Sequence, residues 1–156
     1  MAKQEKYIKS PKETGKYGEK VVLYYLKTKG YRVLATNLRL KTGEIDILIA
    51  KNNAIFLVEV KSTRIVLKND LNHGSKRSLV FEKGSLRGCS VDHEEHLVEP
   101  EDSFTRKKLI KLRLLASDLM SQDWTEGCDI RILGFVVRVL VDKEGLVKTS
   151  LVRRLF

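Results

Sequence analysis

The chain has 156 residues, of which 42% are hydrophobic and 32% are charged, and its formal net charge is +10 at pH 7. This composition predicts a globular domain with a buried core. No apolar run approaches the ~20 residues of a membrane helix, which excludes a membrane-spanning protein. The lysine-rich segment Met1–Lys12 lacks the apolar stretch of a secretory signal. Cys89 and Cys128 form no paired framework, which favours a reduced, cytoplasmic protein.

Charged residues are unevenly distributed along the chain. Residues 1–41 hold 11 Lys and Arg against 3 Asp and Glu, and residues 104–116 hold five basic residues and no acid. Residues 92–102 hold six acids and no Lys or Arg. A basic field attracts polyanions by displacing their counterions, so nucleic acid is the leading partner. A solubilising surface, or attraction to ribosomes or anionic lipid, is the alternative.

The first predicted element is a helix. Residues 1–13 are expected to form a flexible basic N-terminus. The helix is expected to run from Thr14, its N-cap, to Lys29, and Gly30 ends it. Glu19 lies on the flank of the apolar face and can therefore point toward a sheet. That face consists of Val21, Val22, Tyr25 and Leu26.

Three strands are predicted next. Asn52 and Asn53 separate the second strand from the third and tolerate the left-handed conformations of a tight turn. Residues 65–103 have weak periodicity and are interpreted as a long polar insertion in a single domain, 14–156. The predicted strands are Tyr31–Leu40, Glu44–Lys51 and Ala54–Ser62.

The C-terminal third is predicted to hold a second helix and a final strand. The helix is expected from Phe104 to Gln122 with Ser103 as N-cap. The strand Asp129–Val141 follows, then a turn and a C-terminal strand or tail. The order is α-β-β-β-α-β, an α/β fold. The helix's predicted core face consists of Leu112, Leu115, Ala116, Leu119 and Met120.

The hairpin around Asn52-Asn53 carries the candidate chemistry. A symmetric register would place Asp46 opposite Glu59 and Glu44 opposite Lys61, with all four side chains on one face because side chains alternate. The rest of the hairpin is apolar on both faces, as in a sheet covered by helices. The face opposite the acids is expected to pair Ile45 with Val60, Ile47 with Val58 and Ile49 with Phe56.

This cluster of acids needs a compensating charge. Like charges directly opposite each other destabilise a sheet by up to ~1 kcal/mol. A divalent cation shared by Asp46 and Glu59 would neutralise them and activate water. Lys61, two residues after Glu59 on the same face, can bind a phosphate or help to activate that water. An internal salt-bridge network, or a different hairpin register, is the structural alternative.

The stretch Thr14–Lys61 resembles the YraN-like family of small bacterial proteins, which is grouped with restriction-endonuclease-fold and Holliday-junction-resolvase-like nucleases. The likeness is close over residues 14–63 and looser over 104–156. It implies a restriction-endonuclease-like core of the PD-(D/E)xK superfamily, with a mixed central sheet flanked by helices. The matching pieces are Gly18-Glu19, Gly30-Tyr31, Asn37-Leu38-Arg39, Gly43-Glu44-Ile45-Asp46, Val58-Glu59-Val60-Lys61, and Lys108 followed by Lys111-Leu112.

The resemblance also implies an activity, an endonuclease that hydrolyses DNA with Mg²⁺ (or Mn²⁺) and that is expected to act on branched or recombination intermediates. Asp46 and Glu59 would hold the metal, with the Val60 carbonyl as a further ligand. Glu19 would be a ligand directly or through water, and Lys61 would be the catalytic lysine. Nucleic-acid contacts are expected from Lys108, with Lys107 as its competitor, and from Lys111, Arg39 and Lys16.

The sequence departs from the family pattern in three places. Ile45 stands where the family usually has proline, Arg64 is displaced from its expected position, and the connection from Lys61 to Lys108 is much longer. That connection includes Cys89, His93 and His96, whose spacing resembles a zinc site only loosely, so an acid-rich loop is the preferred interpretation.

Alternative functions stay open at this point. A non-catalytic nucleic-acid-binding or accessory protein would use the same fold without turnover. A purely structural protein would hold its acids in an ion-pair network. A homodimer is a further hypothesis, since resolving enzymes commonly dimerise to cut two strands symmetrically.

Overall fold

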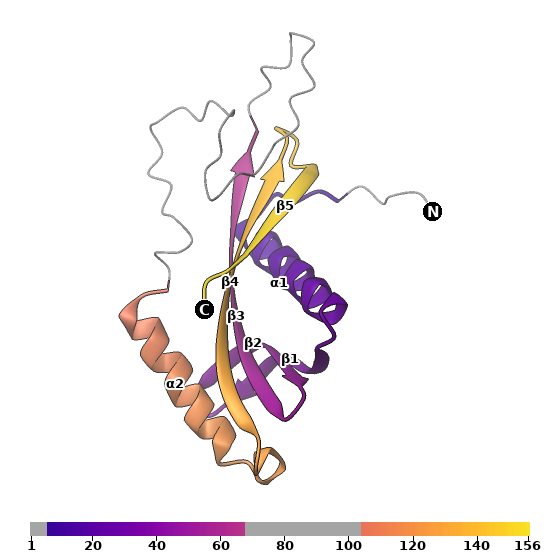
Figure 1. Ribbon diagram of the computed structural model, residues 1–156. Coiled ribbons are helices and arrows are strands. Elements are labelled where there is room, and N and C mark those ends of the chain that lie inside the picture. Colours follow the sequence, from indigo (N-terminus) through magenta and orange to yellow (C-terminus); the bar gives the residue numbers. More distant parts are fainter. Residues whose placement is uncertain (1–5, 68–103) are drawn as a thin grey trace.

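The sheet contains five strands whose spatial order, β1-β2-β3-β4-β5, is also their order in the sequence. It is seen in the computed structural model, which describes residues 6–67 and 104–156. Helix α1 lies on one side of the sheet and helix α2 on the other (Figure 1). The elements are α1 (Pro11–Thr28), β1 (Arg32–Leu40), β2 (Gly43–Lys51), β3 (Ala54–Val66), α2 (Arg106–Met120), the short 3₁₀ helix η2 (Asp123–Thr125), β4 (Asp129–Val141) and β5 (Val147–Arg154).

Strands β3 and β4 make the one parallel pairing of the described sheet, and it extends from Ala54–Asp129 to Val66–Val141. The other three pairings are antiparallel. A parallel pair needs a crossover connection, and α2 lies in that connection. The predicted α-β-β-β-α-β order and mixed sheet are therefore confirmed. The predicted insertion at 65–103 lies outside the described residues from residue 68 onward.

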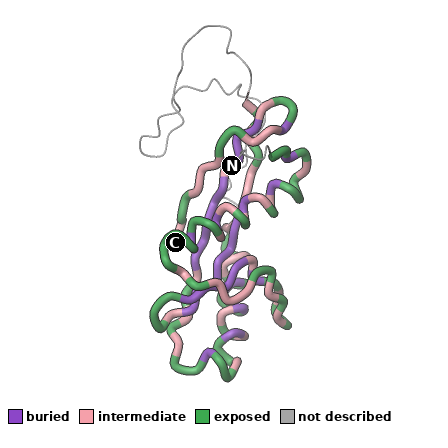
Figure 2. Tube along the Cα trace, turned by 90° about the vertical axis from the view of Figure 1, so that its right-hand side faces the viewer, coloured by how far each residue is buried: buried purple, intermediate pink, exposed green. Residues whose placement is uncertain are grey.

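Each helix covers its own apolar core. Val22 and Leu26 of α1 are buried against one face of the sheet, together with Phe135. Leu115 and Leu119 of α2 are buried against the other face. The buried residues are concentrated in the central strands, which both helices cover (Figure 2). Among the described residues, no helix is long and apolar enough to cross a membrane.

Helix α1 begins at Pro11, so the predicted start at Thr14 is wrong. Ser10 is the N-cap: its hydroxyl accepts a hydrogen bond from the N–H of Glu13, whose carboxylate accepts one from the N–H of Ser10. This reciprocal arrangement satisfies two N–H groups that helix geometry leaves unpaired. Thr14 is buried inside the helix instead. Ile8, in the segment assigned to a flexible N-terminus, is fully buried.

Helix α2 begins at Arg106 and ends at Met120, inside the predicted bounds. Its N-cap is Thr105, whose hydroxyl accepts a hydrogen bond from the N–H of Lys108 at 3.3 Å. The predicted cap, Ser103, lies outside the described residues. Met120 is 60% exposed, so its assignment to the core face is wrong. The helix turns Leu112, Leu115 and Leu119 inward and leaves Met120 on the flank.

The β2–β3 hairpin has the predicted register over half of its length. Lys51 pairs with Ala54 across the turn, and the pairing continues to Ile47 with Val58. Asn52 has a φ of 55°, the left-handed conformation expected of a turn asparagine. No pairing of Asp46 with Glu59 or of Glu44 with Lys61 follows in the described sheet. The backbone pairing of β2 with β3 therefore ends where the acidic residues begin.

Ile45 shows a second consequence of that change. It was expected on the same face as Ile47, opposite Val60, but it packs in the α2 core with Leu48. Ile47 and Val60 are both in the α1 core. Strict alternation would put Ile45 and Ile47 on one face, so the regular alternation of β2 is broken at Asp46, between them.

Candidate active site

Asp46 lies where β2 and β3 stop pairing. Its Oδ2 atom accepts a hydrogen bond of 2.8 Å from the backbone N–H of Val60. Ile47 and Val58 form the last paired position of the ladder. The carboxylate therefore takes the position of a backbone acceptor at the edge of the hairpin, and it brings a negative charge beside β3.

Glu59 is the central acid of the site, with a side chain that is only 2% exposed. Its Oε1 atom accepts from Lys61 Nζ at 2.7 Å and from Lys108 Nζ at 2.6 Å. Lys61 lies two residues further along β3, and Lys108 comes from the first turn of α2. Glu59 Oε2 is buried and has no hydrogen-bond partner among the described residues. A buried carboxylate oxygen without a partner is energetically costly, so Oε2 is the atom of Glu59 open to a further ligand.

Burial, followed by the negative charge of Glu59, raises the pKa of Asp46 from 3.8 to about 6. The Val60 N–H opposes this shift because it stabilises the ionised carboxylate. Glu19, on α1, also raises the pKa of Asp46, and Lys108 lowers it. Acidic and basic side chains from both helices and from β3 therefore act on one carboxylate of β2. A strong shift of this kind at a charged cluster is typical of functional sites.

Gly18 brings α1 close enough to the sheet for Glu19 to act on Asp46. A Cβ atom on Gly18 would lie 1.8 Å from Ser62 Oγ and 2.8 Å from Ser62 Cβ. Only glycine permits this approach. Ser62 follows Lys61 on β3, so the contact fixes α1 beside the strand that carries Glu59. The local sequence pattern does not predict the contact of Gly18 with Ser62, because this contact depends on tertiary packing.

Two predicted residues do not join the cluster. Glu44 was expected on the same face as Asp46, but it pairs with Arg39 across β1 and β2, and its side chain is 43% exposed. Their ion pair is 3.6 Å long. Arg39 is 85% exposed and points away from the core. The placement of Glu44 in the acidic cluster is therefore wrong.

The remaining basic candidates surround the site. Lys108 reaches Glu59 directly, whereas its competitor Lys107 is exposed. The side chain of Lys111 lies against Gly43, at the first residue of β2. Lys16 is exposed on α1 and lines the same pocket as Glu19 and Asp46.

The donor set fits a cation bound by few protein ligands. Among residues 6–67 and 104–156, no group of three His, Cys, Asp or Glu side chains is arranged to hold a metal ion. Glu59 Oε2 nevertheless has no hydrogen-bond partner among the described residues, so this oxygen is available to a ligand beside Asp46. A Mg²⁺ ion commonly uses one or two carboxylates and completes its shell with water and phosphate oxygens. The residues present are compatible with that pattern.

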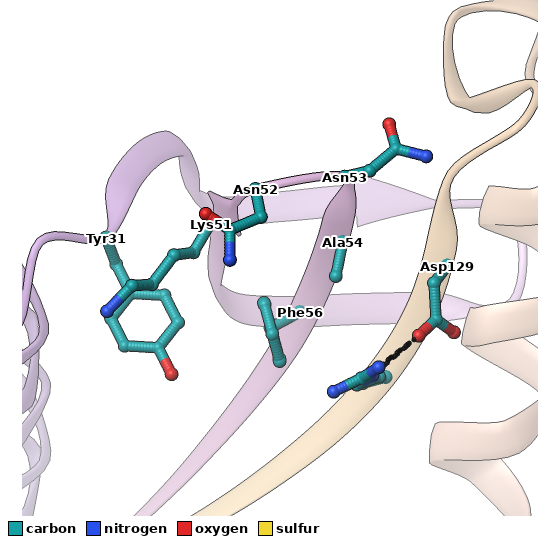
Figure 3. Close-up of a pocket in the computed structure, with 8 residues that line it drawn as sticks. Tyr31, Lys51, Asn52, Asn53, Ala54, Phe56 and Asp129 are labelled. Carbon is teal, nitrogen blue, oxygen red and sulfur yellow. Dashed lines mark hydrogen bonds and ion pairs between the residues drawn. The ribbon is translucent and has the colours of Figure 1, made fainter.

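A separate pocket at the Asn52-Asn53 turn does not share this chemistry (Figure 3). Asp129 forms a 2.6 Å ion pair with Arg131 there. Lys51 lies over the ring of Tyr31, and Arg131 lies over the ring of Phe56. The charged groups of this pocket already have partners, and it contains none of the predicted site residues.

Comparison with known proteins identifies the class to which this geometry belongs. Residues 14–98 match the nuclease-related domain family, NERD, so the chain contains a nuclease-related domain. A UPF0102 protein of Persephonella marina is 30% identical over 109 residues, which cover 69% of this chain and 80% of that protein. The chain belongs to the UPF0102 family, and the YraN-like resemblance is confirmed.

Other relatives match a shorter part of the chain more strongly. A UPF0102 protein of Alkaliphilus metalliredigens is 49% identical over 53 residues, or 34% of this chain and 46% of that protein. One of Clostridioides difficile is 53% identical over 51 residues, or 33% of this chain and 45% of that protein. The chain thus spans about half the length of these two relatives.

Proposed function

We propose that this protein is a metal-dependent endonuclease that hydrolyses phosphodiester bonds in DNA. The observation that carries the proposal is the state of Glu59. It is buried, it has two lysines on one oxygen and no described partner on the other, and it lies beside a second, partly buried acid, Asp46. Neighbouring acids that are shielded from water are rarely structural, and the chain matches a nuclease-related domain.

Asp46 and Glu59 would hold the metal ion, with the Val60 carbonyl and Glu19 as further ligands, Glu19 directly or through water. A bound Mg²⁺ would lower the pKa of a bound water molecule and stabilise negative charge on a phosphate. The hydrogen bond from Val60 fixes the orientation of the Asp46 carboxylate before any ligand arrives.

Lys61 and Lys108 would act on the phosphate. Both ammonium groups lie at Glu59 Oε1, so they are positioned beside any group that binds at Glu59. Lys61 would orient the attacking water or stabilise the developing charge. Lys108 would contact the phosphate from the opposite side of the cluster. Both lysines keep part of their surface exposed, 33% for Lys61 and 23% for Lys108, so a substrate can reach them.

The test is cleavage of labelled DNA. Wild-type protein should be incubated with linear, flap and four-way-junction substrates in Mg²⁺ or Mn²⁺, beside Asp46→Asn and Lys61→Met. We expect metal-dependent cutting that both substitutions abolish, and branched substrates are tested first because the family resemblance favours them. Glu44→Gln is the matched control, since Glu44 is an exposed acid of the same strand, and it should cut like wild type.

The alternative is a non-catalytic accessory protein that holds DNA with the same fold. The ion pairs of Glu59 with Lys61 and Lys108 favour this alternative, because they neutralise the acid without a metal. Tight, salt-sensitive binding with no cleavage, unchanged by Asp46→Asn, would support it. Retained cleavage in Asp46→Asn would contradict the roles assigned to the site.

A further inference from the structure

A groove between helix α1 and strands β1 and β2 leads from the surface to the candidate active site. Lys12, Lys16 and Lys20 line it, and Glu19 and Asp46 also belong to its wall. We call it the α1 groove. Because Asp46 is part of the wall, the groove and the acidic cluster form one continuous surface.

The three lysines form a single row along α1. They are spaced four residues apart, so each step rises about 6 Å along the helix axis and keeps the side chains on one stripe. Like charges at this spacing destabilise an isolated helix. Among the described residues, no acid forms an ion pair with any of the three. The row is therefore an uncompensated line of positive charge, with a spacing of the same order as that of successive phosphates along a nucleic-acid strand.

A second row of α1 residues forms the inner side of the groove. Gly15, Glu19 and Leu23 repeat at the same spacing and also line it. A Cβ atom on Gly15 would meet nothing within 4 Å, so the groove is open at that point. The charge along the groove changes sign, from lysines on the outer row to acids near Asp46. A phosphate is attracted by the lysines and repelled by the acids, except where a cation compensates them.

We infer that the α1 groove binds the sugar–phosphate backbone of the DNA strand that is cut, with about one phosphate for each turn of α1. The strand follows Lys12, Lys16 and Lys20 and reaches the acids at Asp46. The identity of this strand as the one that is cut rests on the proposed function. The binding itself rests only on the groove and its charge.

Binding in EDTA tests the groove without any cleavage. Fluorescence anisotropy should compare wild type with K12Q/K16Q/K20Q on single-stranded and duplex DNA over a range of salt concentrations. The control is R32Q/R113Q/K143Q, which removes the same charge from exposed residues outside the groove. Each lost phosphate contact lowers the salt slope of log K by about 0.9 on duplex and about 0.7 on single strands.

We expect the groove variant to lower the slope by about 2 to 3 and to bind at least about 10-fold more weakly at low salt, while the control changes the slope by less than about 1. The DNA form with the larger loss of slope identifies the strand that the groove accepts. Equal losses in the two variants, or a wild type that binds no DNA, would overturn the inference.

A steric probe gives a second, independent test. Gly15→Trp places a large ring in the open part of the groove, whereas Gly15→Ala leaves it open. Far-UV circular dichroism and melting should show that both variants fold. We expect Gly15→Trp to lose at least about 10-fold in affinity and Gly15→Ala to bind like wild type; a 10-fold change corresponds to about 1.4 kcal/mol. Full binding by folded Gly15→Trp would show that no strand occupies the groove.

The α1-groove proposal and the nuclease proposal can be contradicted independently of each other. DNA binding that depends on the three lysines, in a protein that cleaves no DNA, would contradict the proposed nuclease activity and support the α1 groove as a binding site. Cleavage that depends on Asp46 would support the nuclease activity. Normal DNA binding by K12Q/K16Q/K20Q and by Gly15→Trp would contradict the α1 groove as a binding site.

Discussion

The N–H of Val60 donates to the Asp46 side chain, 2.8 Å away, at the point where β2 and β3 no longer pair through their backbones. Regular hairpins satisfy such an N–H with a carbonyl of the neighbouring strand. Here an ionisable group takes that place, in a position where burial desolvates it. The local geometry of the sheet is therefore linked to the charge of Asp46.

Stability should fall as pH rises through the titration of Asp46. Burial raises the pKa of Asp46 from 3.8 to about 6, so between these values the folded protein binds more protons than the unfolded chain. Stability therefore decreases with increasing pH in this window. The loss is complete above about pH 6 and amounts to about 2–3 kcal/mol, since one pKa unit is about 1.4 kcal/mol.

Asp46→Asn removes this titration and keeps an acceptor for the Val60 N–H. In urea unfolding without metal, the free energy of unfolding of the variant should increase relative to that of wild type from pH 4 to pH 7. Glu44→Gln, an exposed acid of the same strand, should follow wild type throughout. A constant difference between Asp46→Asn and wild type across this range would show that Asp46 has an ordinary pKa.

Divalent cations should stabilise the folded protein saturably. A cation bound at Asp46 and Glu59 binds only the folded state and adds about 2.7 kcal/mol at 100 times its dissociation constant. Thermal unfolding should be followed while Mg²⁺, Mn²⁺ or Ca²⁺ is added. The increase in Tm should vanish in Asp46→Asn and persist in Glu44→Gln. A wild-type Tm that does not respond to these ions would favour an ion-pair cluster without metal.

Lys108 should contribute to stability through Glu59. Its ammonium group is one of two that contact a carboxylate whose side chain is 2% exposed, and hydrogen bonds to charged groups contribute about 1.5–3 kcal/mol. Lys108→Met should cost about that much in denaturant unfolding. Lys107→Met changes an exposed neighbour in the same helical turn and should stay within about 0.5 kcal/mol of wild type.

A double-mutant cycle identifies the partner of Lys108. In a Glu59→Gln background, Lys108→Met should be much less destabilising, and the coupling between two such contacting residues lies in the range of about 0.5–3 kcal/mol. Additive effects would mean that Lys108 stabilises the protein through other contacts.

Gly18→Ala should destabilise the protein, although alanine is the better helix former. The helix propensity favours alanine by about 0.5–1 kcal/mol. The added Cβ would overlap Ser62 Oγ at 1.8 Å, and overpacking costs about 1–3 kcal/mol. Gly15→Ala, three residues earlier in the same helix with nothing within 4 Å, should be stabilising. Ser62→Gly should rescue Gly18→Ala, and an absence of rescue would place the strain elsewhere.

Local patterns predicted much of the fold. The Asn52-Asn53 turn and the alternation of apolar residues were sufficient for the register from Lys51–Ala54 to Ile47–Val58. The end of that register was not predictable, because a symmetric hairpin has no internal signal for a break. The start of α1 was predictable in principle: Ser10 and Glu13 have the spacing of a capping box.

The candidate site was predictable only in part. Asp46, Glu59 and Lys61 follow from their spacing within one hairpin. The contact of Lys108 with Glu59 joins residues 49 positions apart (108 − 59), and the approach of Gly18 to Ser62 joins a helix to a strand. Such distances depend on how the elements pack, and no single segment encodes them. The neighbours of Lys16 in the α1 groove, Lys12 and Lys20, were missed for the same reason.

The place of β3 at the middle of the five strands has a consequence for motion. Brief openings of a protein usually release terminal and edge elements, and here those are β1 and β5. Glu59, Val60 and Lys61 lie on a strand that pairs with β4 along this stretch, pairs with β2 as far as Val58, and is covered by both helices. Amide hydrogens in the paired parts of β3 should therefore exchange with deuterium only when the whole domain unfolds. The acidic cluster thus keeps its shape while the borders of the sheet fluctuate.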